Sequence, residues 1–154
     1  KAIITIVASV LGAQDFFTNG YYETFRTHSF SPSNWRESIN LVVSDFYDRI
    51  QNHPTLSKPF SIVTHWKEHK EKIAEFWWVV LGGIPNSPYK YDPVNKHFAA
   101  GFTQELLEDW KALFFEVLSQ HLPLNLAQAW QSRVELIGGN LLIQNDRLIQ
   151  KTLE

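Results

Sequence analysis

The stretch from residue 60 to residue 81 constrains the fold most, because its apolar residues recur at helical spacing. The apolar stripe consists of Trp66, His69, Ile73, Phe76 or Trp77, and Val80. Spacings of three and four alternate along this stripe, which is the period of one helix face. Four charged residues occupy the opposite face: Lys67, Lys70, Glu71 and Lys72. The spacing predicts one amphipathic helix over residues 60–81.

A histidine, His69, occupies a position on this apolar stripe among large rings. The commoner interpretation is a core or boundary histidine whose ring nitrogens bond to the backbone. The alternative is that the face lines a pocket and that His69 points into it. His65 precedes His69 by one helical turn, and such a pair can hold a metal ion, but no third ligand follows at a telling spacing.

Composition excludes several classes of protein. The 154 residues suit one domain with a substantial core. A net charge of −2 with mixed signs and no basic block gives no indication of nucleic-acid binding. The absence of Cys removes disulfides, zinc-thiolate sites and cysteine nucleophiles. The chain contains six Trp and eleven Phe, and rings in this number either build a core or surround a flat ligand.

Two further long helices and a short one follow from local signals. Asn34 and Glu37 have the spacing of a capping box, which opens a helix that ends at His53-Pro54. The buried face of that helix is predicted to hold Ile39, Val42, Val43, Phe46 and Ile50, with Tyr47 at its edge. After a turn-rich link over residues 82–91, Asp92-Pro93 starts a short helix that stops near Gly101. A long helix over residues 103–121 ends before Pro123.

A final helix is predicted over residues 124–151, and no stretch alternates with period two. The chain is therefore predicted to be all-α, with four long helices and one short one. We divide it into an extension, residues 1–33, and a helical domain, residues 34–154.

The first thirteen residues place a lysine before a short apolar run, which resembles the end of a signal peptide. The run is shorter than the roughly 20 apolar residues that span a bilayer, and its cleavage pattern is poor. We expect no membrane span and a cytoplasmic protein, with a processed signal or an anchor left open. The chain starts at Lys1 and lacks methionine, which fits a processed product or a piece of a longer protein.

A series of motifs in one order resembles the truncated haemoglobins, specifically their third group. The series runs from about residue 34 to residue 146, and the N-terminal extension is outside the family pattern. Its members are Asp45-Phe-Tyr47-Asp-Arg-Ile50, Lys58-Pro-Phe60, Trp66-Lys-Glu-His69-Lys-Glu-Lys-Ile73, Phe76-Trp77, Tyr89-Lys-Tyr-Asp-Pro93-Val-Asn-Lys-His97-Phe98 and Trp110-Lys-Ala-Leu-Phe114. Single pieces are unspecific, whereas the ordered series is fairly specific.

The resemblance implies a shortened globin with two helices packed on two and haem b in the crevice. His97 takes the proximal position and would bond the haem iron. Tyr47, His69 and Trp110 take distal positions, with His69 as a donor, a gate or a sixth iron ligand. The remaining residues implied in the haem pocket are Phe60, Trp66, Ile73, Phe76, Trp77, Tyr89, Phe98 and Phe114. Lys90 and Lys96, with Tyr89, are candidates for contacts with the haem propionates.

Such a site would bind O2, NO, CO or peroxide, because one protein ligand leaves the opposite coordination position open. Carriage, gas sensing and redox chemistry on NO or peroxide all stay open, and so does enzyme status. Several distal donors predict slow oxygen release, which suits chemistry or sensing better than delivery. A redox enzyme would need a separate reductase, because the chain has no flavin or nicotinamide motif. The alternative is a cofactor-free helical interaction or scaffold domain, in which all the rings are packing.

Overall fold

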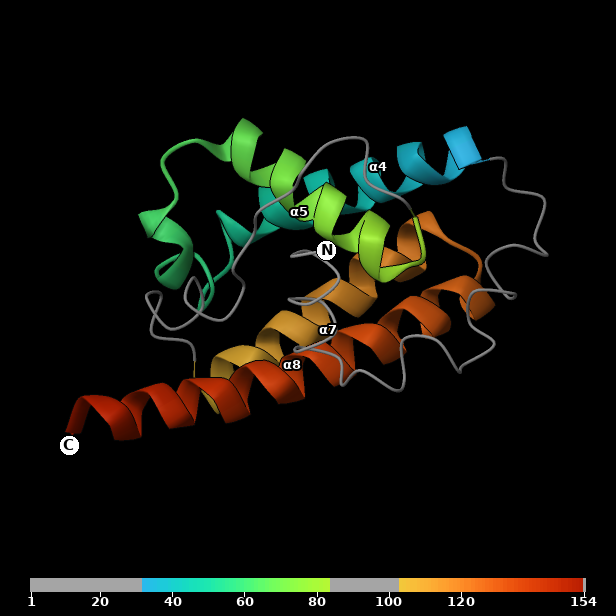
Figure 1. Ribbon diagram of the computed structural model, residues 1–154. Coiled ribbons are helices and arrows are strands. Elements are labelled where there is room, and N and C mark those ends of the chain that lie inside the picture. Colours follow the sequence, from blue (N-terminus) through green and yellow to red (C-terminus); the bar gives the residue numbers. More distant parts are fainter. Residues whose placement is uncertain (1–31, 84–102, 154) are drawn as a thin grey trace.

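The computed structural model describes residues 32–83 and 103–153, and these residues are helical with short connections (Figure 1). The elements are α4 (Pro32–Ile50), the short 3-10 helix η1 (Pro59–Ile62), α5 (Trp66–Val80), α7 (Gln104–His121) and α8 (Leu124–Leu153). No strand occurs in these two ranges, so the all-α prediction is confirmed. Residues 1–31 of the predicted extension and the whole predicted short helix over residues 92–101 lie outside the described residues.

The four long helices form two layers of two. Helix α4 packs against α5, α7 packs against α8, and α4 also contacts α7 across the layers. Figure 1 shows the α4–α5 pair lying over the α7–α8 pair, with the last turns of α8 projecting past the other helices. This arrangement is the two-on-two helical sandwich that the resemblance implies. Among the helices of 32–83 and 103–153, none combines the length and apolar character needed to cross a bilayer.

Helix α4 buries the face that its spacing predicts: Ile39, Val42, Val43, Phe46 and Ile50. The predicted capping box is wrong, because the helix begins at Pro32 and Asn34 lies inside it. Proline is favourable at a first helical position, where its missing N–H is not needed. The end is close to the prediction, at Ile50. His53 stabilises the turn that follows, since its Nδ1 atom accepts from the backbone N–H groups of Thr55 and Leu56, each at 3.2 Å.

The single helix predicted over residues 60–81 is two elements in the structure. Residues 59–62 form η1, Val63 is extended with φ −76° and ψ 121°, and α5 begins only at Trp66. Pro59 favours the tight 3-10 turn, and the β-branched run Ile62-Val-Thr64 follows it, which has a low helix propensity. The separate turn directs Phe60 inward, where it is buried.

Two glycines end α5 in a Schellman motif. The Gly82 N–H donates to the Val79 carbonyl at 3.1 Å, and the Gly83 N–H donates to the Trp78 carbonyl at 2.7 Å. Gly82 has φ 99°, which a side chain would strain. A Cβ atom on Gly83 would lie 2.1 Å from Cε2 of Trp78, so the chain passes directly over that ring.

Helices α7 and α8 begin and end within two residues of the bounds that the sequence predicts. Thr103 caps α7 by accepting from the Leu106 N–H at 3.3 Å, and Pro123 separates α7 from α8. Helix α8 runs without interruption through Gly138 and Gly139. At Gly138 the two helices approach so closely that an added Cβ atom would lie 2.9 Å from Cδ1 of Leu107.

Candidate functional site

Four aromatic side chains from three elements form one cluster, which we call the Tyr47 cluster: Tyr47, Phe60, Trp66 and His69. Tyr47 projects inward from α4 and is only 4% exposed. Its ring centroid lies 5.2 Å from that of His69, and the two planes are nearly perpendicular at 88°. Phe60 from η1 and Trp66 from α5 each lie 5.9 Å from Tyr47. The structure thus brings together four residues that the sequence analysis assigned to a haem pocket.

The Tyr47 cluster combines apolar rings with polar atoms. Trp66 and His69 also contact each other, with centroids 5.6 Å apart and planes at 87°. The Nε2 atom of His69 is shielded from solvent although the residue as a whole is half-buried. The hydroxyl of Tyr47 and the imidazole of His69 can both donate hydrogen bonds. Donors among rings are what a small polar ligand in an apolar setting requires.

Trp110 approaches this cluster from α7, and Phe46 lies between it and Tyr47. The Phe46 ring is 5.0 Å from Tyr47 and 6.0 Å from Trp110, with edge-to-face geometry at both contacts. The Nε1 atom of Trp110 is also shielded from solvent. Phe46 was predicted only as a residue of the core face of its helix, and its place between two candidate site residues was not predicted. The sequence signal that could have indicated this place is that Phe46 directly precedes Tyr47.

Two other predicted pocket residues, Trp77 and Phe114, contribute to a second group of rings in the interior. Trp77 lies 5.3 Å from Phe114 and 5.7 Å from Trp130, which is fully buried. Phe114 also contacts Trp110 at 5.6 Å, so it connects this group with the candidate site. Phe76 and Ile73 are both buried on the same face of α5. Trp130 of α8 was not among the predicted pocket residues, although it belongs to the same group of rings.

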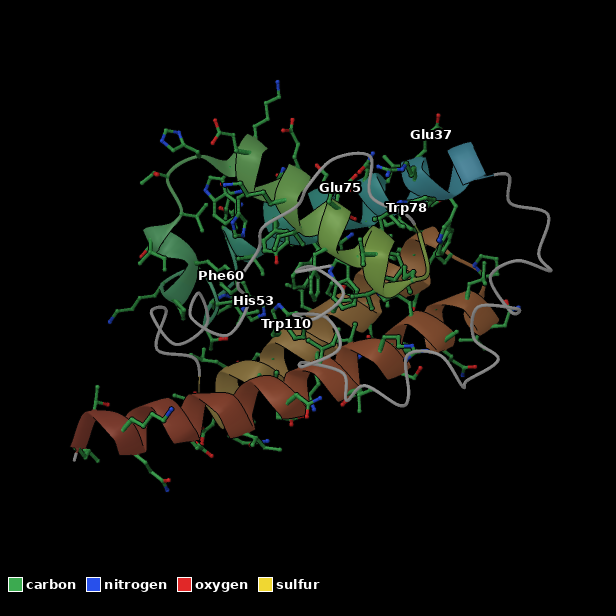
Figure 2. The ribbon with its side chains drawn as sticks, viewed as in Figure 1. Glu37, His53, Phe60, Glu75, Trp78 and Trp110 are labelled. Carbon is green, nitrogen blue, oxygen red and sulfur yellow. The ribbon has the colours of Figure 1, made fainter. Side chains whose placement is uncertain are left out.

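The turn after α4 is fixed to α7 beside Trp110. The hydroxyl of Thr55 donates to Oδ2 of Asp109 at 2.6 Å, and Asp109 immediately precedes Trp110. Figure 2 labels His53, Phe60 and Trp110 in this part of the molecule. This hydrogen bond therefore ties the turn just before η1, the element that carries Phe60, to the helix that carries Trp110.

An ionic group joins the last turns of α4 and α7. Asp45 accepts from Arg49 Nε at 3.0 Å and lies 2.7 Å from Nε2 of His121, while Arg49 also pairs with Glu116 at 3.5 Å. Partial burial acts to raise the pKa of the Asp45 carboxyl, but hydrogen bonds from Arg49 and His121 outweigh it and lower the pKa below its usual value. This group supports the helix that carries Tyr47 without joining the Tyr47 cluster.

Five predicted site residues lie outside the described residues: Tyr89, Lys90, Lys96, His97 and Phe98. Among the described residues, Tyr47, His69 and Trp110 are the ones that the resemblance implies to be distal. In the described ranges, no group of three or more His, Asp or Glu side chains is arranged to hold a metal ion.

Comparison with known proteins agrees with this architecture. A group 3 truncated hemoglobin of Campylobacter jejuni is 34% identical over 90 residues, and the match covers 54% of this chain and 69% of that protein. No family model matches the chain, and no solved structure does. The all-helical, two-on-two arrangement and this match lead to the same conclusion. The chain belongs to the group 3 truncated haemoglobins.

Proposed function

We propose that this protein binds haem b and uses it to bind a small diatomic ligand, with Tyr47, His69 and Trp110 on the ligand side. The observation that carries the proposal is the Tyr47 cluster. In it, the ring centroids of the Tyr47 phenol and the His69 imidazole lie 5.2 Å apart, and the rings of Phe60 and Trp66 contact the phenol. A relative named as a truncated hemoglobin supports the same function.

The residues present fit a haem. A porphyrin is flat and largely apolar. Phe60 and Trp66 offer two aromatic faces close to Tyr47, and Ile73 offers a buried aliphatic side chain on α5. His97 is proposed as the proximal iron ligand, and Tyr89 and Phe98 as its neighbours in the pocket. Phe76, Trp77 and Phe114 would support the pocket from the interior. A haem iron with one imidazole ligand offers an open coordination position for O2, NO, CO or peroxide.

The roles of the distal residues follow from their hydrogen-bonding groups. The Tyr47 hydroxyl and the Trp110 indole N–H are donors, and a donor among apolar rings acts more strongly on a polar ligand than it would in water. His69 would be a third donor, a gate or a sixth iron ligand in the unliganded protein. Ile73, one turn after His69, would limit the volume left for the ligand.

Several donors around one ligand slow its release, which favours redox chemistry on NO or peroxide, or gas sensing, over oxygen delivery. Redox turnover would require electrons from a reductase, whose identity the fold does not indicate. We propose a cytoplasmic protein on the basis of its sequence.

The test is haem retention by matched histidine variants. The purified protein should show an intense absorption band near the violet edge of the visible spectrum, and its ferrous form should change on adding CO. His97→Ala should lose most of the haem, whereas His65→Ala, at an exposed position before α5, should keep it. Full retention with unchanged coordination in His97→Ala would show that the proximal ligand is assigned wrongly. A colourless chain that takes up no hemin would favour a cofactor-free scaffold.

A further inference from the structure

The end of α5 that carries Trp66 and His69 is weakly held by apolar packing. The buried residues of α5 begin at Ile73, so the first two turns contribute no fully buried side chain. His65, at the N-cap position, makes no side-chain capping bond. Helix ends with few buried contacts and no cap open at a low free-energy cost. Besides the contacts of the Trp66 and His69 rings with Tyr47, a polar contact with α4 would therefore help to fix the distance of His69 from that helix.

Lys70 provides that contact. The prediction that Lys70 lies on the face opposite the apolar stripe is wrong, because its side chain turns toward α4 and is only 22% exposed. Its Nζ atom lies 2.6 Å from Oδ1 of Asp48 and 3.2 Å from Oγ of Ser44. Ser44 and Asp48 are one turn apart on α4, so one ammonium group binds two successive turns.

The two partners of this ion pair are the neighbours of two candidate site residues. Asp48 follows Tyr47 on α4, and Lys70 follows His69 on α5. At the opposite end of the same helix pair, Arg36 pairs with Glu75 and covers the ring of Trp78 at 4.4 Å. Figure 2 labels Glu75 and Trp78 at this end of α5. The helices are thus tied at both ends, and of these two ties the one made by Lys70 lies beside the Tyr47 cluster.

We infer that Lys70, through Asp48 and Ser44, is a positioning residue that sets the separation of His69 from Tyr47 and thereby the residence time of a small ligand. This inference rests on the proposed function for its effect on the ligand, but the positioning itself does not require a cofactor. Because Asp48 is 62% exposed, the ion pair is open to screening by salt. Ionic strength is therefore predicted to regulate ligand release.

The kinetic experiment compares oxygen dissociation from the ferrous protein at low and high salt. Lys70→Met keeps the apolar stem and removes the charge, and it should speed dissociation about two- to fivefold at low salt, the range available to a partly exposed ion pair. High salt should speed release from the unaltered protein and leave Lys70→Met unchanged. Asp48→Asn removes the other charge and should behave as Lys70→Met does, which covers the case that one variant folds poorly.

The matched control is Lys67→Met. Lys67 lies one turn earlier on α5, is exposed, and makes no ion pair within the described ranges. Its replacement should leave both the rate and its salt dependence as in the unaltered protein. Dissociation from Lys70→Met at the unaltered rate, at every salt concentration, would overturn the inference.

A structural readout separates this inference from the haem proposal. Trp66 contacts both Tyr47 and His69, so the 19F NMR signal of fluorotryptophan at this position, assigned with Trp66→Phe, reports their arrangement. The signal should shift in Lys70→Met and in Asp48→Asn but not in Lys67→Met. If the chain takes up no hemin, the haem proposal fails while this measurement still applies to the chain as purified. A Trp66 signal that does not move in Lys70→Met would then overturn the positioning role.

Discussion

At the scale of single residues, the candidate site depends on Tyr47, whose ring contacts Phe46, Phe60, Trp66 and His69. Four ring contacts hold the phenol in one orientation, so its hydroxyl acts from a fixed position. Preorganisation of this kind means that little ordering remains to be done when a ligand arrives. Removal of the Tyr47 hydroxyl is therefore the most direct single substitution with which to test the candidate site.

Tyr47→Phe removes the hydroxyl and keeps the ring contacts. If the phenol donates to the ligand, its loss should speed oxygen dissociation or autoxidation by roughly tenfold, since one such hydrogen bond is worth about 1 kcal/mol or slightly more. Stopped-flow absorption of the ferrous oxygenated protein gives the rate. Haem retention should not change in the same preparation. Rates equal to those of the unaltered protein would remove Tyr47 from the set of donors.

At the scale of elements, two kinds of contact hold the helices: close backbone approach and ionic ties between helix ends. Gly138 shows the first, because α7 and α8 meet where an added methyl group would press on Leu107, one turn before Trp110. The group formed by Asp45, Arg49 and His121 shows the second. Both act on helices that carry candidate site residues.

The adjacent glycines of α8 form a matched pair of sites. A Cβ atom at Gly139 meets nothing within 4 Å, so Gly139→Ala should raise the free energy of unfolding by about 1 kcal/mol through helix propensity. Gly138→Ala has the same propensity gain but displaces the buried Leu107, so it should gain less or lose stability. Urea unfolding of both variants measures the difference. Equal gains at the two positions would show that the helices do not approach closely there.

Acid should weaken the tie between α4 and α7. The pKa of Asp45 is lowered in the folded chain, so its carboxylate favours the folded state above the unfolded pKa of about 3.9. That contribution is lost as the pH falls through the lower, folded pKa. The stability difference between the unaltered protein and Asp45→Asn should therefore be constant near neutral pH and shrink below about pH 4. Urea unfolding across this range measures it, and a difference that does not vary with pH would contradict the ion-pair role.

At the scale of the whole molecule, helical periodicity predicted most of the architecture. The buried face of α4 follows from spacing, because core packing and helix propensity agree along this stretch. Segment 60–65 was mispredicted, since its apolar residues continue the pattern of α5 although Pro59 and a β-branched run favour a separate turn. Periodicity assigns residues to a face but does not reveal which partner helix that face meets.

The candidate site was predictable only in part for the same reason. The order of the motifs indicated Tyr47, Phe60, Trp66 and His69 as pocket residues, and the structure places the other three rings in contact with Tyr47. Lys70 could not be recognised from its own helix, because its role depends on Ser44 and Asp48 of α4. Contacts between helices of distant sequence are set by crossing geometry, which a single-helix pattern does not contain.

Addition of one equivalent of hemin to the purified protein, followed by absorption spectra of the ferric, ferrous and CO-bound forms, tests the central claim that this fold holds a haem with an open ligand position. We predict saturation at one haem per chain, a sharp violet band distinct from that of free hemin, and a further shift of that band when CO is added to the ferrous protein. A spectrum that stays that of free hemin, with no response to CO beyond that of hemin alone, would contradict the claim.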